Sequence, residues 1–269
     1  MTENSILLPT GKEHISFSEL SNWTECSYRH KLLYVDKLGE DAYSIHLVFG
    51  TAIHAVCENY IKTGKLDTEI ATKYLVENLK ESPANSAKAH QWVKDICADI
   101  PDFMNTTFPN WKMIEAEEFL MEKVFKDSEH PKFGKFKGYI DAIIEAPTVN
   151  TKKKKDVTWI LDWKTCLWGW RVDQKRDPQK RLQLALYKVY WSKKHNVDLK
   201  NIRCGFVLLK KQAKAGRHCE LVQISVGDKT LNSAELAVKN MLRCLSKGIS
   251  IKNKESCKWC EFKGTDHCK

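Results

Sequence analysis

The segment Ile160–Thr165, with the sequence Ile-Leu-Asp-Trp-Lys-Thr, constrains the fold and chemistry of this chain more than any other. It ends an apolar run of the kind that forms a strand. Because side chains alternate between the two faces of a strand, Asp162 and Lys164 must project from one face while Trp163 turns away. A carboxylate and an ammonium group are therefore predicted to lie side by side.

A second carboxylate belongs to Asp141, which lies within another apolar run, Tyr139–Ala146, that also predicts a strand. If the two strands pair, Asp141 and Asp162 can converge on one hard divalent cation, with Lys164 beside them. Such a site suits phosphodiester hydrolysis, because the metal lowers the pKa of a bound water and takes up charge on the phosphoryl oxygens. The lysine can orient that water or offset the developing charge.

Three motifs follow one another in the chain: Gly138-Tyr139-Ile140-Asp141, Asp162-Trp163-Lys164 and Gln183-Leu184-Ala185-Leu186-Tyr187. In this order they resemble the RecB-type nucleases of the PD-(D/E)XK superfamily. The resemblance implies an α/β, restriction-endonuclease-like fold, with a mixed, largely antiparallel central sheet flanked by helices. It also implies a metal-dependent DNA nuclease, most simply an exonuclease that hydrolyses single strands or DNA ends with Mg²⁺ or Mn²⁺.

The resemblance also assigns roles to single residues. The segment Gly50-Thr51-Ala52-Ile53-His54 matches the Gly-x-x-x-His motif of the family, whose histidine is a metal ligand. By composition alone, a helical histidine is more often structural or solvated. The implied metal ligands are His54, Asp141, Asp162 and the backbone carbonyl of Trp163, the implied catalytic residues are Asp141, Asp162 and Lys164, and the implied substrate-binding residues are Gln183 and Tyr187.

A cysteine cluster lies at the C-terminus, where Cys257 and Cys260 form a Cys-x-x-Cys motif and Cys268 follows. Three thiolates so placed can surround one metal centre, and the fourth ligand must come from elsewhere, for which Cys26 is our choice. Three free thiols are a less favoured alternative. The remaining cysteines lie in apolar surroundings and are predicted to be buried thiols: Cys57, Cys97, Cys166, Cys204, Cys219 and Cys244.

The segment from Ser16 to Arg29 resembles the N-terminal part of the iron-sulfur RecB-type nucleases, which include AddB-like and CRISPR-associated members. In those proteins one N-terminal cysteine and three C-terminal cysteines hold a [4Fe-4S] cluster that clamps the chain ends together. The family's proline after the first cysteine is replaced here by Ser27. His267 supports a rival assignment, in which Cys26 and the C-terminal Cys and His side chains bind Zn²⁺.

Length and charge set further bounds. The 269 residues can form a single nuclease domain, with a catalytic core at about 111–226, an N-terminal helical part at 15–108 and a C-terminal part at 228–269 that carries cysteines. The net charge of +10 favours a polyanionic partner such as DNA, although a soluble basic protein is an equal alternative from charge alone. No apolar run is long enough to span a bilayer and Met1–Gly11 does not resemble a secretory signal, so we expect no membrane partner and a cytoplasmic location.

Two basic or aromatic segments are candidate DNA contacts. Trp168, Trp170 and Arg171 follow the predicted metal site and can stack on unpaired bases, although tryptophan is as often a core residue. Lys152–Lys155 lies in a predicted hairpin loop, where a charge run is usually only solvated. Glu115 and Glu117 share one face of the preceding strand and can support the metal site, but solvated carboxylates are the likelier interpretation of that pattern.

Two other functions agree with the sequence. One is a non-catalytic DNA-binding or recombination subunit that keeps the nuclease fold, and the other is a zinc-stapled structural protein. Protein partners from recombination, repair or CRISPR adaptation are implied only by the resemblance.

Periodicity and capping signals predict helices at 16–35, 67–81, 86–107, 178–194 and 233–247, with another helix that begins near residue 49. They also predict strands at 111–125, 202–209 and 219–225, and a turn at Asp127–Pro131.

Overall fold

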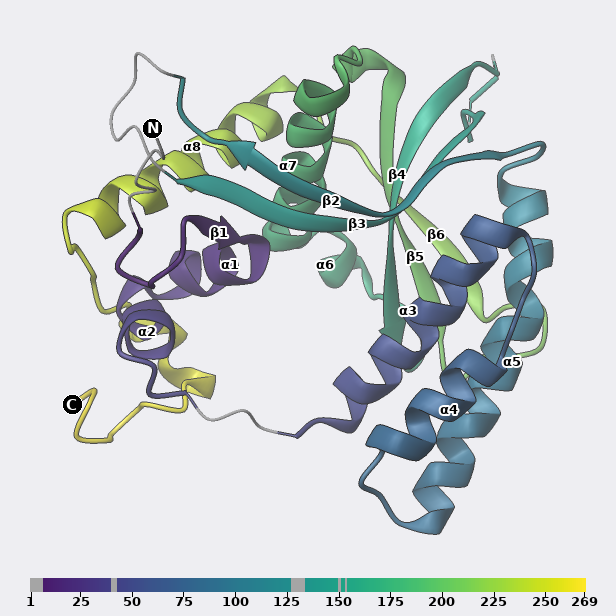
Figure 1. Cartoon of the computed structure of the whole chain (residues 1–269), viewed down its shortest axis with the longest axis horizontal. Helices are drawn as coiled ribbons and strands as arrows, with labels where there is room; N and C mark the ends of the chain where they lie inside the picture. Colours follow the sequence, from purple (N-terminus) through teal and green to yellow (C-terminus); the bar gives the residue numbers. More distant parts are fainter. Residues whose placement is uncertain (1–6, 40–42, 127–133, 150, 153) are drawn as a thin grey trace, which may run out of the picture. The chain divides into compact units, whose positions relative to one another are not determined.

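The computed structural model describes residues 7–39, 43–126, 134–149, 151–152 and 154–269. The chain divides into two compact units, each described here by itself (Figure 1). The first comprises Met1–Asp41, Phe119–Gly138 and Gly227–Lys269, and the second comprises Ala42–Glu118 and Tyr139–Val226. The turn predicted at Asp127–Pro131 lies outside the described residues.

Most of the sheet that is expected to carry the chemistry lies in the second unit, but the strand that ends at Lys123 and the strand that begins at Lys135 extend into the first. The strand order is β3-β4-β5-β6, and β2 also pairs with β3. β3 and β4 are antiparallel, as are β5 and β6, whereas β4 and β5 are parallel. The strands are β2 (Lys112–Lys123), β3 (Lys135–Pro147), β4 (Asp156–Cys166), β5 (Ile202–Lys210) and β6 (Cys219–Ile224).

The mixed sheet and the predicted strands are confirmed, with antiparallel pairing of β3 with β4 and of β5 with β6 and parallel pairing of β4 with β5. Parallel neighbours need a crossover connection, and α7 (Pro178–His195) lies between these two strands in the chain. Pro178 occupies the first turn of α7, where its missing N–H costs no hydrogen bond. The parallel pairing therefore follows from a helix that the sequence analysis placed correctly.

Three longer helices of the same unit pack against one face of the sheet. Phe49 and Ile53 belong to α3, Ile96 belongs to α5, and they share a buried core with Trp159 and Trp163 of β4. Pro101 lies inside α5, so of the two effects that a proline predicts there, a kink or a helix boundary, the boundary does not occur. The helices are α3 (Ile45–Thr63), α4 (Glu69–Asn78) and α5 (Pro83–Thr107), with short helical turns at α6 (Val172–Lys175) and Leu199–Asn201.

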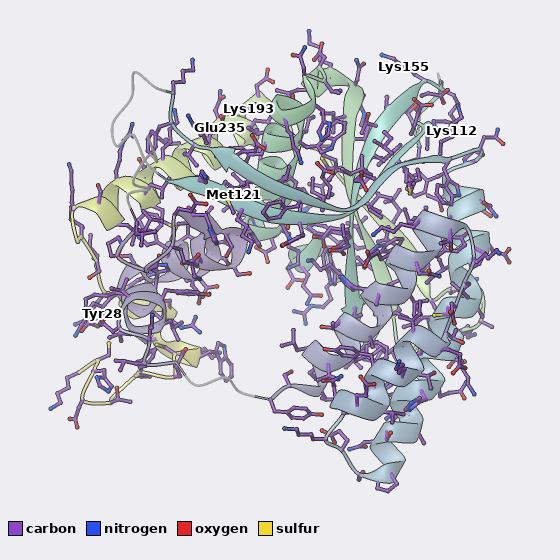
Figure 2. All side chains as sticks on the ribbon, in the orientation of Figure 1. Tyr28, Lys112, Met121, Lys155, Lys193 and Glu235 are labelled. Carbon is purple, nitrogen blue, oxygen red and sulfur yellow. The ribbon has the colours of Figure 1, made fainter. Side chains whose placement is uncertain are left out.

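The connection between β3 and β4 is the predicted hairpin, since Pro147 pairs with Asp156. Of its lysine run, Lys152, Lys154 and Lys155 are exposed, and residues 150 and 153 lie outside the described part of the chain. Lys155 is labelled in Figure 2, which shows its side chain at the edge of the ribbon. Contact of this loop with DNA stays a prediction.

The first unit begins with a short strand and a capped helix. β1 (His14–Ser16) pairs in parallel with residues 135–137 of β3. Ser16 starts α1 (Phe17–Glu25) with the predicted capping box, because its Oγ accepts from the N–H of Glu19 at 3.2 Å and Glu19 Oε2 accepts from the N–H of Ser16 at 3.2 Å. This part of the sequence analysis is confirmed.

The single helix expected from Ser16 to Val35 is wrong, because the chain breaks at Cys26. This residue is extended, with φ of −159° and ψ of 107°, and it both ends α1 and caps the next helix. The elements that follow in this unit are α2 (Ser27–His30), a π-helical turn at Lys31–Val35, α8 (Asp228–Ser246) and a 3₁₀ turn at Lys254–Trp259. Within the described residues, none of the helices combines the length and apolar character needed to cross a lipid bilayer.

Candidate functional site

The core of the site is the pair formed by Asp162 and Lys164 on β4. Lys164 Nζ lies 2.6 Å from Asp162 Oδ2, while the side chain of Trp163 is buried in the core. This is the arrangement that strand alternation predicts. Asp162 is only 2% exposed, so its charge meets Lys164 with little screening by water.

The antiparallel pairing of β3 with β4 brings Asp141 to the same place. Asp141 Oδ2 accepts a hydrogen bond from the backbone N–H of Trp163 at 2.7 Å. His54, on α3, has its Nδ1 3.6 Å from the same carboxylate oxygen. The structure therefore brings together the His54, Asp141, Asp162 and Lys164 side chains predicted from separate segments.

Two side chains of α7 complete the surroundings of Asp162. Gln183 Nε2 donates to Asp162 Oδ1 at 2.9 Å and to the Tyr187 hydroxyl at 3.3 Å. Gln183 and Tyr187 are four residues apart and so lie on one helix face. Both are buried, at 8% and 6% exposure; Gln183 contacts the carboxylate, and Tyr187 contacts Gln183.

Burial and charge together set the protonation of the site. Burial raises the pKa of Asp162, which Lys164 opposes and Asp141 reinforces. Burial, the largest single effect on Lys164, would lower its pKa, but the charge and hydrogen bond of Asp162 and the charge of Asp141 together raise that pKa, so the lysine stays protonated. For His54 the hydrogen bond and charge of Asp141 likewise outweigh burial and raise the pKa. Burial also raises the pKa of Tyr187, which keeps its hydroxyl neutral.

Glu117 is a third carboxylate close enough to feel the charges of Asp141 and His54, and the sequence pattern alone does not distinguish it from Glu115. Its φ of +54° is rare for a residue other than glycine, and it interrupts the regular alternation of β2. Glu115 is exposed, whereas Glu117 is half-buried. Burial, with the charges of Asp141 and Glu58, raises the pKa of Glu117 to about 7.

Glu117→Gln is expected to stabilise the metal-free protein at high pH. A folded-state pKa of about 7, above the ordinary 4.5, means that the wild type loses stability as the pH rises through about 7, and the uncharged glutamine cannot lose it. Thermal unfolding in chelator should therefore give equal midpoints for the two proteins in acid and a higher midpoint for the variant above about pH 7. Glu115→Gln, on the same strand but exposed, is the control, and equal pH profiles for all three proteins would contradict the assignment.

Comparison with known proteins decides the family. A family model for the PD-(D/E)XK nuclease superfamily matches residues 14–265. The chain belongs to this superfamily. Its structure is similar to the crystal structure of a candidate exonuclease from Eubacterium rectale, with a TM-score of 0.58, 16% sequence identity, and coverage of 98% of this chain and 92% of that one. The comparison with curated proteins found no match.

PD-(D/E)XK nucleases commonly use a divalent metal, and the donor set of this chain fits one. Two carboxylates, with Glu117 near them, supply the hard oxygen atoms that Mg²⁺ and Mn²⁺ prefer. No aligned hydrogen bond reaches the buried Oδ2 of Asp162, although Lys164 lies beside it. Within the described ranges, no three His, Cys, Asp or Glu side chains form a ready-made metal-binding group, so the ligand set remains a prediction.

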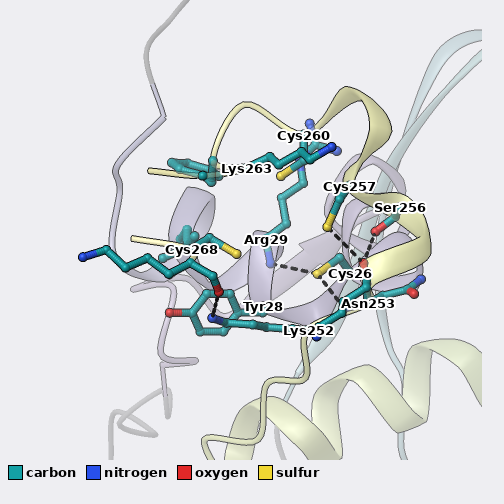
Figure 3. A pocket seen from close by; sticks show the side chains of 15 residues that line it. Cys26, Tyr28, Arg29, Lys252, Asn253, Ser256, Cys257, Cys260, Lys263 and Cys268 are labelled. Carbon is teal, nitrogen blue, oxygen red and sulfur yellow. Dashed lines mark hydrogen bonds between the residues drawn. The ribbon is translucent and has the colours of Figure 1, made fainter. Parts of the chain in front are cut away.

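The four predicted cluster cysteines line one pocket of about 400 Å³ in the first unit: Cys26, Cys257, Cys260 and Cys268 (Figure 3). Cys26 Sγ accepts hydrogen bonds from the backbone N–H groups of Arg29 and Asn253, each at 3.4 Å. These bonds fix the position of the Cys26 sulfur, the atom through which cysteine binds a metal. Among the residues that the structure describes, these four cysteine side chains do not form a preformed metal-binding site.

Hydrogen bonds also join the segments on which these cysteines lie. The N–H of Tyr28 donates to the carbonyl of Ile251 at 3.1 Å, and the N–H of Ile251 donates to Ser27 Oγ at 2.7 Å. Arg29 Nε donates to Glu261 Oε2 at 2.9 Å. The predicted contact between the chain ends is therefore made by the polypeptide itself.

The remaining cysteines divide into two groups. Burial raises the pKa of Cys57, Cys97 and Cys204, which suits inert thiols, as predicted. The predicted burial is wrong in degree for Cys166, Cys219 and Cys244, which are only half-buried, although burial still raises the pKa of Cys166 and raises that of Cys219 to about 12. Cys166 and Cys219 lie at strand ends, where one side of a residue is open to solvent.

Proposed function

We propose that this protein is a Mg²⁺- or Mn²⁺-dependent deoxyribonuclease, acting as an exonuclease on single-stranded DNA or DNA ends. The observation that carries the proposal is the buried Asp162 carboxylate, paired with Lys164 at 2.6 Å and fixed by Gln183 at 2.9 Å. Asp141 and His54 adjoin it. The net charge of +10 supports a polyanionic substrate.

In this proposal Asp141, Asp162, His54 and the carbonyl of Trp163 hold the cation. The bound metal would lower the pKa of a water and neutralise charge on the phosphate. Lys164, protonated because of its neighbouring carboxylate, orients the attacking water and stabilises charge on the phosphoryl oxygens.

The roles of Gln183 and Tyr187 follow from their contacts. Gln183 holds one oxygen of Asp162, and the other oxygen, which lies beside Lys164, would be the one to bind a cation. Tyr187 in turn supports Gln183. We propose that this pair acts on the substrate mainly through Asp162, since both side chains are buried.

Cleavage should depend on added metal. DNA labelled at its 5′ or 3′ end, in single- and double-stranded form, is incubated with Mg²⁺, Mn²⁺ or chelator. We expect degradation with either metal and none with chelator, because the carboxylates cannot activate water alone. Mononucleotides or short products released from one end identify an exonuclease, whereas internal fragments identify an endonuclease. DNA binding with no metal-dependent cleavage would support the non-catalytic subunit instead.

For the cysteine pocket we propose a [4Fe-4S] cluster, with Zn²⁺ as the alternative. The support is the four thiols on one pocket and the two N–H groups directed at Cys26. Protein purified without oxygen should be brown if it holds iron and sulfur and colourless if it holds zinc. Protein partners from DNA repair, recombination or CRISPR adaptation, and a cytoplasmic location, are consistent with such a nuclease and belong to the same proposal.

A further inference from the structure

The loop that follows β4 is held in one position next to the candidate site. The N–H of Lys211 donates to the carbonyl of Cys166 at 2.9 Å, and the N–H of Gln212 donates to that of Leu167 at 2.8 Å. Gly169 has a φ of +116°, a conformation that side chains other than glycine rarely adopt. The loop therefore joins β4 at its end and is tied to the segment after β5.

The two tryptophans of this loop have different surroundings. The ring of Trp170 packs edge-on against Phe206 with centroids 5.1 Å apart, and Lys180 Nζ lies 4.8 Å from the Trp170 centroid. Phe206 is the partner of Asp162 in the β4–β5 register, and Lys164 Nζ lies 5.6 Å from its ring. Trp170 thus anchors the loop on the ring that also contacts the candidate catalytic lysine.

Trp168, in contrast, is 71% exposed, and Leu167 beside it is 42% exposed. Burying a large apolar side chain such as tryptophan is favourable, and an exposed tryptophan does not gain this free energy within the protein. An exposed ring on an anchored loop is therefore suited to bind a ligand with a flat apolar face. Unpaired nucleic-acid bases have such faces and stack on aromatic side chains, whereas the bases of an intact duplex are already stacked on one another.

We propose that Trp168 is a stacking platform for an unpaired nucleotide of the DNA strand that enters the site. The proposal rests on the proposed nuclease function and narrows its substrate to single strands or frayed ends. Two further observations favour a nucleic acid over a protein partner. The loop is continuous with the strand that carries Asp162 and Lys164. Arg171 on the loop and Lys180 beside it are ion-paired with Asp173 at 3.0 Å and Asp177 at 2.7 Å, and a phosphate can compete for the exposed guanidinium of Arg171.

The test measures binding in chelator, so that cleavage plays no part. Fluorescently labelled oligo(dT) and a blunt duplex are titrated with the wild type and with Trp168→Ala, Trp168→Phe and Trp259→Ala. The last variant is the matched control, because Trp259 is also exposed, at 85%. Trp168→Ala should weaken oligo(dT) binding about 10- to 100-fold, the range expected for one stacked base, while the phenylalanine retains most of the affinity. Duplex binding and the control should be unchanged.

Oligo(dT) binding by Trp168→Ala equal to that of the wild type would overturn the proposal, and so would an equal loss in Trp259→Ala. Because the Trp168 side chain is exposed, circular dichroism should show that each variant is folded. Failure of the nuclease proposal is distinguishable: single-strand binding would then still depend on Trp168, but no metal would produce cleavage.

Discussion

Asp162→Asn is expected to abolish DNA cleavage and leave the protein folded. Asparagine keeps the shape and can still accept the hydrogen bond from Gln183, but it removes the charge that binds a cation and pairs with Lys164. Loss of one preorganised electrostatic group commonly lowers the rate about 10²- to 10³-fold, and loss of a metal ligand should lower the cleavage rate by more than that. Rates are measured on end-labelled DNA at saturating Mg²⁺.

The stability of this variant gives a second readout. Burial raises the pKa of Asp162 above its ordinary value, so the ionised carboxylate destabilises the fold as the pH rises through that raised pKa. The neutral amide removes this cost but leaves the Lys164 ammonium without its carboxylate, so the unfolding midpoint of the variant should fall less than that of the wild type as the pH rises through the raised pKa of Asp162.

Lys164→Ala should also lose DNA cleavage, because the ammonium that orients water is lost.

Asp156→Asn is the matched control, since this exposed residue begins the same strand and lies away from the paired carboxylates. It should keep wild-type activity and stability. Retained cleavage by both Asp162→Asn and Lys164→Ala would refute the hydrolytic assignment. Inactivity of the control as well would show that the assay reports folding and not chemistry.

Cys26→Ala is expected to destabilise the protein strongly and not merely to slow cleavage. The thiol has two roles: it caps α2 through the N–H of Arg29, and it lines the pocket with the C-terminal cysteines. Loss of a cap costs about 1 kcal/mol. Loss of a ligand to a structural metal costs far more, because structural zinc sites alone contribute about 10 kcal/mol of apparent binding energy.

Cys26→Ser separates the two roles. Serine is a good helix cap but a poor ligand for iron or zinc. If the pocket holds a metal, the serine and alanine variants should both unfold at much lower temperature and lose their iron or zinc. If it does not, only alanine should lose stability, by about 1 kcal/mol. The half-buried Cys244, on α8 and outside the pocket, provides the control Cys244→Ala. A stable, fully metal-loaded Cys26→Ala protein would contradict the clamp.

Much of the local structure could be predicted from the sequence because its causes are local. The capping box of Ser16 and Glu19 joins residues three apart, and α7 begins at a proline suited to a first helical turn. The helix break at Cys26 could not be predicted in this way. The thiol accepts one hydrogen bond from nearby Arg29 but another from Asn253, which is 227 residues away in the chain.

The sequence by itself determined that Asp162 and Lys164 share one face of a strand, because alternation depends only on the extended backbone. Only the tertiary structure decided which groups surround them. Asp141 reaches the N–H of Trp163 through pairing of β3 with β4, and Gln183 reaches Asp162 through the placement of α7. A sequence argument places the side chain of Glu117 from the two-residue alternation of a regular strand, and the positive φ of this residue departs from the backbone conformation on which that alternation depends. These contacts join segments that are distant in the sequence. Their energies depend on the burial of the polar groups, and these groups become buried only when the chain folds.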